Sequence, residues 1–176
     1  AINYGSFLES TISREGDLIH RCYLQFDISG VEADDDIGPN LGSALIDSVE
    51  LEIGGQRIDK HYGHWMETWA ELTELNPNGH AGQTGSDGTL VNGTIFQNMS
   101  RMGGVEGRTL VSGPTLTPFW VPLYFWFCRN PGLALPLIAL QYHEVKIKFD
   151  WGVKSEIGGS TDVEAECNVW CDYVYL

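Results

Sequence analysis

The side chains best suited to chemistry lie between positions 61 and 67, where two histidines and a glutamate recur at every third residue. His61, His64 and Glu67 supply imidazole nitrogens and carboxylate oxygens, which zinc accepts as ligands in proteins. The chain changes from strand to helix character near Gly63, and this change separates His61 from the other two residues. The spacing therefore favours a polar helix face beside a strand-end histidine. We expect no metal site and no cofactor, and these three residues are the candidates should a metal bind.

No other set of residues forms a catalytic motif. The sequence has no glycine-rich phosphate loop and no arrangement of serine, histidine and aspartate typical of a hydrolase. His20 falls on the apolar phase of its strand without a positioned nucleophile, so we expect a hydrogen-bonded core histidine rather than a general base. The chain is therefore not expected to be an enzyme.

Four cysteines raise the question of a disulfide or a zinc site. Cys167 and Cys171 lie four residues apart in one predicted strand, which places them roughly 13 Å from each other. That distance is too long for a disulfide or a shared metal ion. Cys22 falls in another strand and Cys128 beside an apolar run. We expect buried free thiols in a reducing compartment.

Composition and charge limit the partners. The chain has 176 residues, of which 43% are hydrophobic. This length is enough for a single domain, residues 1–176, with its own core. The formal net charge is −14. Because a surface this acidic repels phosphate backbones, we expect no direct contact with nucleic acid. The uncharged run from Asn130 to His143 is interrupted by Pro131 and Pro136. It is too short to span a bilayer, and no membrane insertion is expected.

Several elements must position these side chains. Apolar and polar residues alternate with a period of two in four segments, a pattern typical of half-buried strands. The segments are Leu18–Ile28, Leu45–Ile53, Val145–Trp151 and Val163–Tyr173. The pair Gly54-Gly55 after the second segment can adopt the positive φ angles of a tight hairpin.

One segment has helical spacing. Apolar residues between Tyr62 and Leu72 predict a helix from His64 to Leu75. The glycine-rich stretch from Asn76 to Gly107 shows little periodicity, so we expect a long loop that projects from the surface. The predicted fold is all-β: an antiparallel eight-stranded jelly-roll β-sandwich with one short helix and this long loop insertion, residues 76–107.

Two glycosylation sequons lie within the predicted loop. They begin at Asn92 and Asn98, and an exposed loop is where a glycan can be accommodated. Both asparagines are candidate attachment sites.

Four segments of the sequence resemble one known family in their order and spacing. They are GDLIHRCYL (Gly16–Leu24), VELEIGGQRIDKHYGHWMETWAEL (Val49–Leu72), PLYFWFCRNPGLALPLIALQYHEVKIKFDW (Pro122–Trp151) and VWCDYVYL (Val169–Leu176). The chain resembles the major capsid protein of nucleocytoplasmic large DNA viruses of the phycodnavirus and iridovirus kind. The resemblance spans most of the chain and covers the first jelly roll of a double jelly-roll protein.

The resemblance implies a structural virion protein, made late in infection and assembled in the host cytoplasm. Three such chains form a pseudo-hexagonal capsomer, and capsomers tile an icosahedral shell together with minor capsid proteins. Trp65, Trp69, Trp120 and Trp126 are then candidate interface anchors, because large aromatic side chains dominate interface energetics. The alternative for all four is a place in the core. The second roll is absent from this sequence, which is consistent with a fragment or with a genuine single-roll protein.

Three other functions remain open at this point. Within the capsid class, the chain could be a single-jelly-roll penton or minor capsid protein. A carbohydrate-binding β-sandwich would use exposed aromatic rings as stacking platforms, and a cupin-like metalloenzyme would use His61, His64 and Glu67. Most aromatic residues lie in apolar runs or on inward strand phases, which argues against carbohydrate binding.

Overall fold

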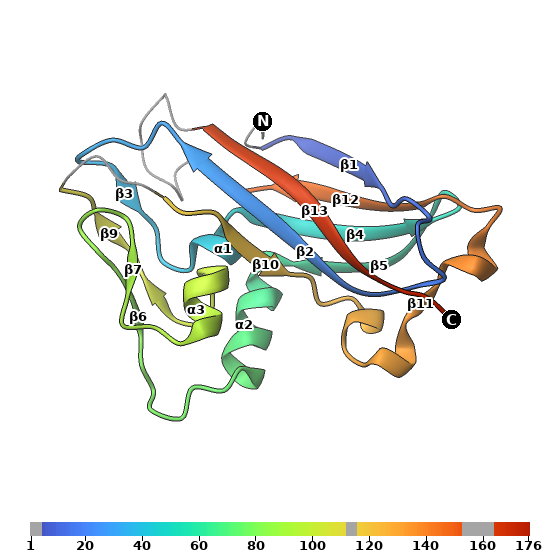
Figure 1. Cartoon of the computed structure of the whole chain (residues 1–176). Helices are drawn as coiled ribbons and strands as arrows, with labels where there is room; N and C mark the ends of the chain where they lie inside the picture. Colours follow the sequence, from blue (N-terminus) through green and yellow to red (C-terminus); the bar gives the residue numbers. More distant parts are fainter. Residues whose placement is uncertain (1–4, 112–115, 153–163) are drawn as a thin grey trace.

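Two antiparallel sheets face each other in the computed structural model, which describes residues 5–111, 116–152 and 164–176 (Figure 1). The first sheet has the strand order β1 (Phe7–Thr11), β12 (Val145–Trp151), β4 (Ile46–Ile53), β5 (Gln56–Tyr62). In the second sheet β2 (Leu18–Ser29) is central, and it pairs with β13 (Glu164–Val174), β10 (Phe119–Pro122) and β11 (Leu135–Pro136). The predicted antiparallel sandwich is confirmed, and Val163, the first residue of one predicted strand, lies outside the described residues.

The period-two pattern correctly indicates which residues face the core. In β12 the residues Val145, Ile147, Phe149 and Trp151 are buried, whereas the residues between them are half-buried. Across the sandwich, the ring of Phe26 on β2 meets Trp151 edge-on with ring centroids 5.7 Å apart. Side chains from both sheets therefore interdigitate in one core, as expected for aligned sheets.

The hairpin between β4 and β5 forms at Gly54 and Gly55, as predicted. Their φ angles are +59° and +81°, which is the left-handed backbone that a two-residue type I′ turn requires and that glycine adopts most easily.

His20 departs from the predicted pattern. The pairing of β2 with β13 shifts register between Asp172 and Tyr173, because His20 is an extra residue on β2. This β-bulge reverses the inward phase of the strand, so Ile19 is fully buried and His20 only half-buried. The predicted hydrogen bond is present, since His20 Nδ1 lies 3.3 Å from the carbonyl oxygen of Phe127.

The helix predicted from His64 to Leu75 is present as α2 (Gly63–Thr73). The prediction of one helix was wrong, because the described residues also contain other short helices. They are α1 (Leu41–Ala44), α3 (Ile95–Ser100), and the 3₁₀ turns η1 (Trp126–Cys128), η2 (Pro131–Leu133) and η3 (Leu137–Leu140).

The predicted long loop has structure of its own. Between residues 76 and 107 lie β6 (Gly82–Thr84), β7 (Leu90–Val91), α3 and β8 (Val105–Glu106), and β6 pairs in parallel with β8. A further two-stranded pair joins β3 (Asp36–Ile37) to β9 (Arg108–Thr109). Figure 1 shows α2, α3 and these small strands on one side of the sandwich. The described helices are all too short or too polar to cross a membrane.

Candidate functional site

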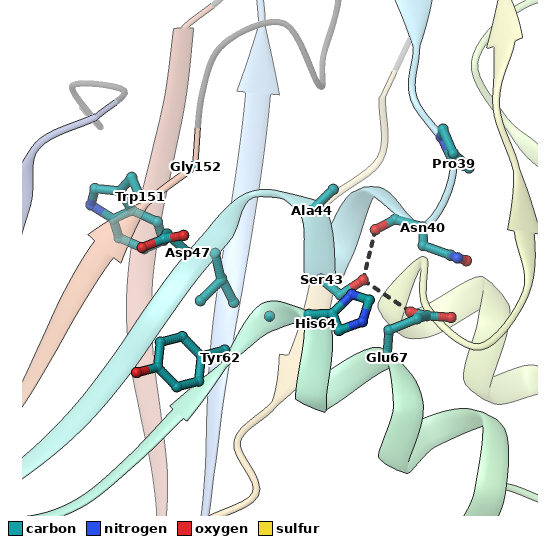
Figure 2. Close-up of a pocket in the computed structure, with 12 residues that line it drawn as sticks. Pro39, Asn40, Ser43, Ala44, Asp47, Tyr62, His64, Glu67, Trp151 and Gly152 are labelled. Carbon is teal, nitrogen blue, oxygen red and sulfur yellow. Dashed lines mark hydrogen bonds between the residues drawn. The ribbon is translucent and has the colours of Figure 1, made fainter.

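A cavity lies where α1, the β5–α2 junction and the end of β12 meet (Figure 2). Its volume is about 600 Å³, and its wall includes Ser43, Tyr62, His64, Glu67 and Trp151. The elements meet closely because residue 63 is glycine. A Cβ atom at Gly63 would lie 2.1 Å from the carbonyl oxygen of Ile46 and 2.2 Å from that of Ser43.

The carboxylate of Glu67 connects three parts of the chain. One oxygen, Oε1, accepts hydrogen bonds from the backbone amides of Gly103 at 2.9 Å and Gly104 at 3.1 Å. The other oxygen accepts one from the hydroxyl of Ser43 at 2.9 Å, drawn as a dashed line in Figure 2. With both oxygens engaged, Glu67 acts as a structural anchor rather than an open metal ligand.

Asn40, the residue before α1, binds the same segment as Glu67. It has left-handed backbone, with φ +50°, and its Oδ1 accepts hydrogen bonds from the amides of Gly104 at 3.1 Å and Val105 at 2.6 Å. The hydroxyl of Ser43 also donates to the Asn40 carbonyl oxygen at 3.0 Å. The side chains of Glu67 and Asn40 therefore hold residues 103–105 against α1 and α2.

The two histidines of the candidate metal set lie apart. His64 is exposed beside the cavity, whereas His61 is 5% exposed and its ring meets Phe125 edge-on at a centroid distance of 4.8 Å. Neither ring nitrogen of His61 has a hydrogen-bond partner among the described residues, and burial lowers the pKa of His61 to about 4. Across the described ranges, no three His, Cys, Asp or Glu side chains gather in a group that could hold a metal ion.

The four candidate interface tryptophans divide into two kinds. Trp65 is 40% exposed and Trp120 is 38% exposed. Trp69 and Trp126 are half-buried, and Trp126 packs against the core. The sequence analysis did not single out Trp170, which is 57% exposed on β13. Trp170 lies on the polar phase of that strand, and its exposure could have been predicted from this position in the sequence.

One face of α2 presents an apolar stripe, formed by Trp65, Trp69 and Leu72. The spacing i, i+4, i+7 places these residues on one side of the helix, and Leu72 is 74% exposed. The rings of Trp65 and Trp69 lie 5.7 Å apart, and the guanidinium of Arg129 stands 5.2 Å above the Trp69 ring. We call these three residues the α2 stripe.

Both sequon asparagines are exposed. Asn92 has left-handed backbone with φ +58°, and Asn98 lies on α3. Thr94, the third residue of the first sequon, is the N-cap of α3, because its side chain accepts a hydrogen bond from the Gln97 amide. Glycosylation at either asparagine stays a prediction.

A family described as "Major capsid protein N-terminus" matches residues 1–176, which is the whole chain. The chain belongs to the major capsid protein family. Members of this family are structural proteins of viral capsids.

Curated relatives in this family come from large DNA viruses. The major capsid protein of Pyramimonas orientalis virus is 45% identical over 175 residues, covering 99% of this chain and 41% of that protein. The major capsid protein of Paramecium bursaria Chlorella virus 1 is 36% identical over 191 residues, covering 100% of this chain and 37% of that protein. The chain thus spans about two fifths of the length of these relatives.

Solved structures agree with the family assignment. The crystal structure of PBCV-1 VP54, fitted into a reconstruction of the virophage Sputnik, matches with a TM-score of 0.74 and 32% identity. The match covers 100% of this chain and 40% of the other. The STIV major capsid protein, at 11% identity and a TM-score of 0.54, is similar in fold alone. The jelly-roll class predicted from the strand pattern is confirmed.

Proposed function

We propose that the chain is the first jelly roll of a major capsid protein and serves as a structural unit of the icosahedral shell of a large DNA virus. The observation that carries this proposal is the match of the whole chain, residues 1–176, to the N-terminal region of that family. The cavity beside α2 fits the same reading, because its carboxylate and amide side chains hold the fold together. The protein acts in the virion and is assembled in the host cytoplasm.

Assembly proceeds through pseudo-hexagonal trimers that contact neighbouring capsomers and minor capsid proteins. The α2 stripe supports this part of the proposal, because two tryptophan rings and a leucine lie on the surface of one helix. Clustered aromatic side chains of this kind form the energetic centre of protein interfaces. With a net charge of −14, copies of the chain repel one another, so apolar contact must supply the attraction. Glycans at Asn92 and Asn98 would lie outside the stripe.

The mass of the native assembly, measured together with the intact chain mass, tests this proposal. We expect trimers of a chain longer than this 176-residue sequence. Pentamers of a single-roll chain would favour the penton alternative, and a protein that stays monomeric at high concentration would contradict both.

The variant pair Trp65→Ala with Leu72→Ala tests the stripe. Loss of an interface anchor costs about 2 kcal/mol or more, so losing both should cost about 4 kcal/mol and weaken trimer association on the order of a thousandfold. Tyr142→Ala is the matched control, because Tyr142 is 88% exposed and lies outside the stripe. Unchanged trimers in the double variant would place the interface elsewhere.

A further inference from the structure

Three thiols from distant parts of the sequence meet at the second sheet. Cys22 on β2 and Cys171 on β13 are direct partners in the strand pairing, and their sulfur atoms lie 3.3 Å apart. Cys128, in η1, lies near Cys22, and both residues line the same cavity. All four cysteines of the chain are free thiols in this structure.

We infer that Cys22 and Cys171 are a redox pair that closes into a cross-strand disulfide when the protein meets oxidising surroundings. Paired residues on antiparallel strands have Cα atoms about 4.5–5.5 Å apart, which lies within the range that a disulfide spans. Rotation of the two side chains therefore suffices to join the sulfur atoms, and the strands need not move apart or slide.

The pair is accessible to a small oxidant. Cys171 is half-buried and lines a cavity of about 330 Å³ between β1 and β13, together with Ser13 and Val169. Cys22 is 1% exposed, and it lines a separate cavity of about 240 Å³. Cys171 is therefore the sulfur that an oxidant reaches first, and Cys22 is the thiol that resolves the reaction.

With glutathione disulfide as the oxidant, the reaction has two steps. The Cys171 thiolate attacks one glutathione sulfur, forms a mixed disulfide and releases the first glutathione thiolate. Cys22 then attacks the sulfur of Cys171 and releases the second. The two cysteine protons pass to the two glutathione thiolates, and the two electrons reduce the glutathione disulfide. The neighbouring thiols of Cys128 and Cys171, together with burial, raise the pKa of the Cys22 thiol well above its ordinary value, so the attack by Cys22 is the slower of the two steps.

The bond would fasten an edge strand. Within the described residues, β13 pairs with β2 alone, and Figure 1 shows β13 along the side of the sheet. Cys22 and Cys171 are separated by 149 positions, so their bond would close a very long loop and restrict the unfolded chain strongly. A protein made in reducing cytoplasm would carry the thiols, and the same protein outside the cell would carry the disulfide. This inference does not depend on the capsid function.

Peptide mapping tests the pairing. The purified protein is reduced, freed of reductant, treated with glutathione disulfide, alkylated and digested with trypsin. We expect the peptide that starts at Cys22 to be linked to the peptide that starts at Ser155, with Cys171 as the linked residue. Both Cys167 and Cys171 lie in that second peptide, so fragment masses must assign the bond. A bond from Cys22 to Cys128, or glutathione adducts without any internal bond, would overturn the inference.

The variants Cys171→Ser and Cys167→Ser form a matched pair. Both cysteines lie on the inward phase of β13, but Cys167 pairs with Phe26 and has no facing thiol. Oxidation should raise the melting temperature by about 5–10 °C in the wild type and in Cys167→Ser, and should leave Cys171→Ser unchanged. A wild-type protein that melts no higher after oxidation would refute the stabilising role.

Discussion

The carboxylate of Glu67 lies 2.9 Å from the backbone amide of Gly103, although 36 positions separate the two residues. Glu67 belongs to α2, and Gly103 belongs to the segment that returns from α3. This contact attaches the segment after α3 to α2, so it helps to hold the small strands and α3 against the sandwich.

We expect Glu67→Gln to loosen this region. The amide of glutamine offers one acceptor oxygen in place of two, so at least one donor among Ser43, Gly103 and Gly104 loses its hydrogen bond to residue 67. Hydrogen bonds to a charged group contribute about 1.5–3 kcal/mol, and the free energy of unfolding in urea should fall by about 2 kcal/mol. Amide hydrogen exchange at Gly103 and Gly104 should accelerate. Glu166→Gln on the exposed phase of β13 is the control and should change neither quantity.

His61 should make the protein sensitive to acid. Burial lowers the pKa of His61 to about 4, whereas the unfolded chain binds the same proton near pH 6.5. The stability contributed by neutral His61 is therefore complete above pH 6.5 and is lost as the pH falls toward 4, to a total of about 3 kcal/mol. His61→Phe should remove this loss in unfolding curves measured between pH 7 and pH 4. The control His64→Phe replaces an exposed ring, and it should retain the acid sensitivity of the wild type.

Gly63→Ala should be strongly destabilising. The added Cβ would lie 2.1 Å and 2.2 Å from two backbone carbonyl oxygens, and backbone atoms cannot move aside as side chains do. We expect a loss of about 3 kcal/mol or more in the free energy of unfolding. At Gly132 a Cβ would meet only the Asn130 side chain at 3.4 Å, so Gly132→Ala should cost less than about 1 kcal/mol. An equal loss of stability in Gly63→Ala and Gly132→Ala would show that the β5–α2 junction can move to make room for a Cβ atom at residue 63.

Thr94 serves α3 and the first sequon together, and two variants separate these roles. Thr94→Ala removes the capping box formed with Gln97, and it should lower stability by about 1 kcal/mol even in protein without glycans. Thr94→Ser keeps the cap and the sequon, so it should preserve stability and any sugar seen by mass spectrometry. Asn92→Asp should abolish a glycan at that site without this loss of stability, because aspartate also tolerates the left-handed backbone at residue 92.

Features set by neighbouring residues could be predicted from the sequence. The alternation in β12 and the two glycines of the β4–β5 hairpin depend on local sterics and burial, and both are confirmed. Helix α3 could also have been found, since Thr94 and Gln97 form the spacing of a capping box. Its position within a glycine-rich stretch obscured that signal.

Features set by distant pairing could not be predicted. The bulge at His20 arises from the register of β2 against β13, and no pattern within one strand encodes it. The same register places Cys22 opposite Cys171. Spacing along the sequence gives a distance only between cysteines in the same strand. The anchoring role of Glu67 could not be predicted either, because two of its hydrogen-bond donors are backbone amides, and backbone groups leave no trace in residue types.

The pairing of β2 with β13 also sets the order in which the protein can fold during synthesis. Cys22 and Cys171 are 149 positions apart, and a ribosome that adds about 5–20 residues per second takes roughly seven to thirty seconds to make that stretch. Throughout this interval one side of β2 has no strand to pair with, and contacts so distant in sequence form slowly. The nascent chain is therefore vulnerable to wrong pairing with other copies until β13 leaves the ribosome, and it is a natural client for a chaperone that shields strand edges.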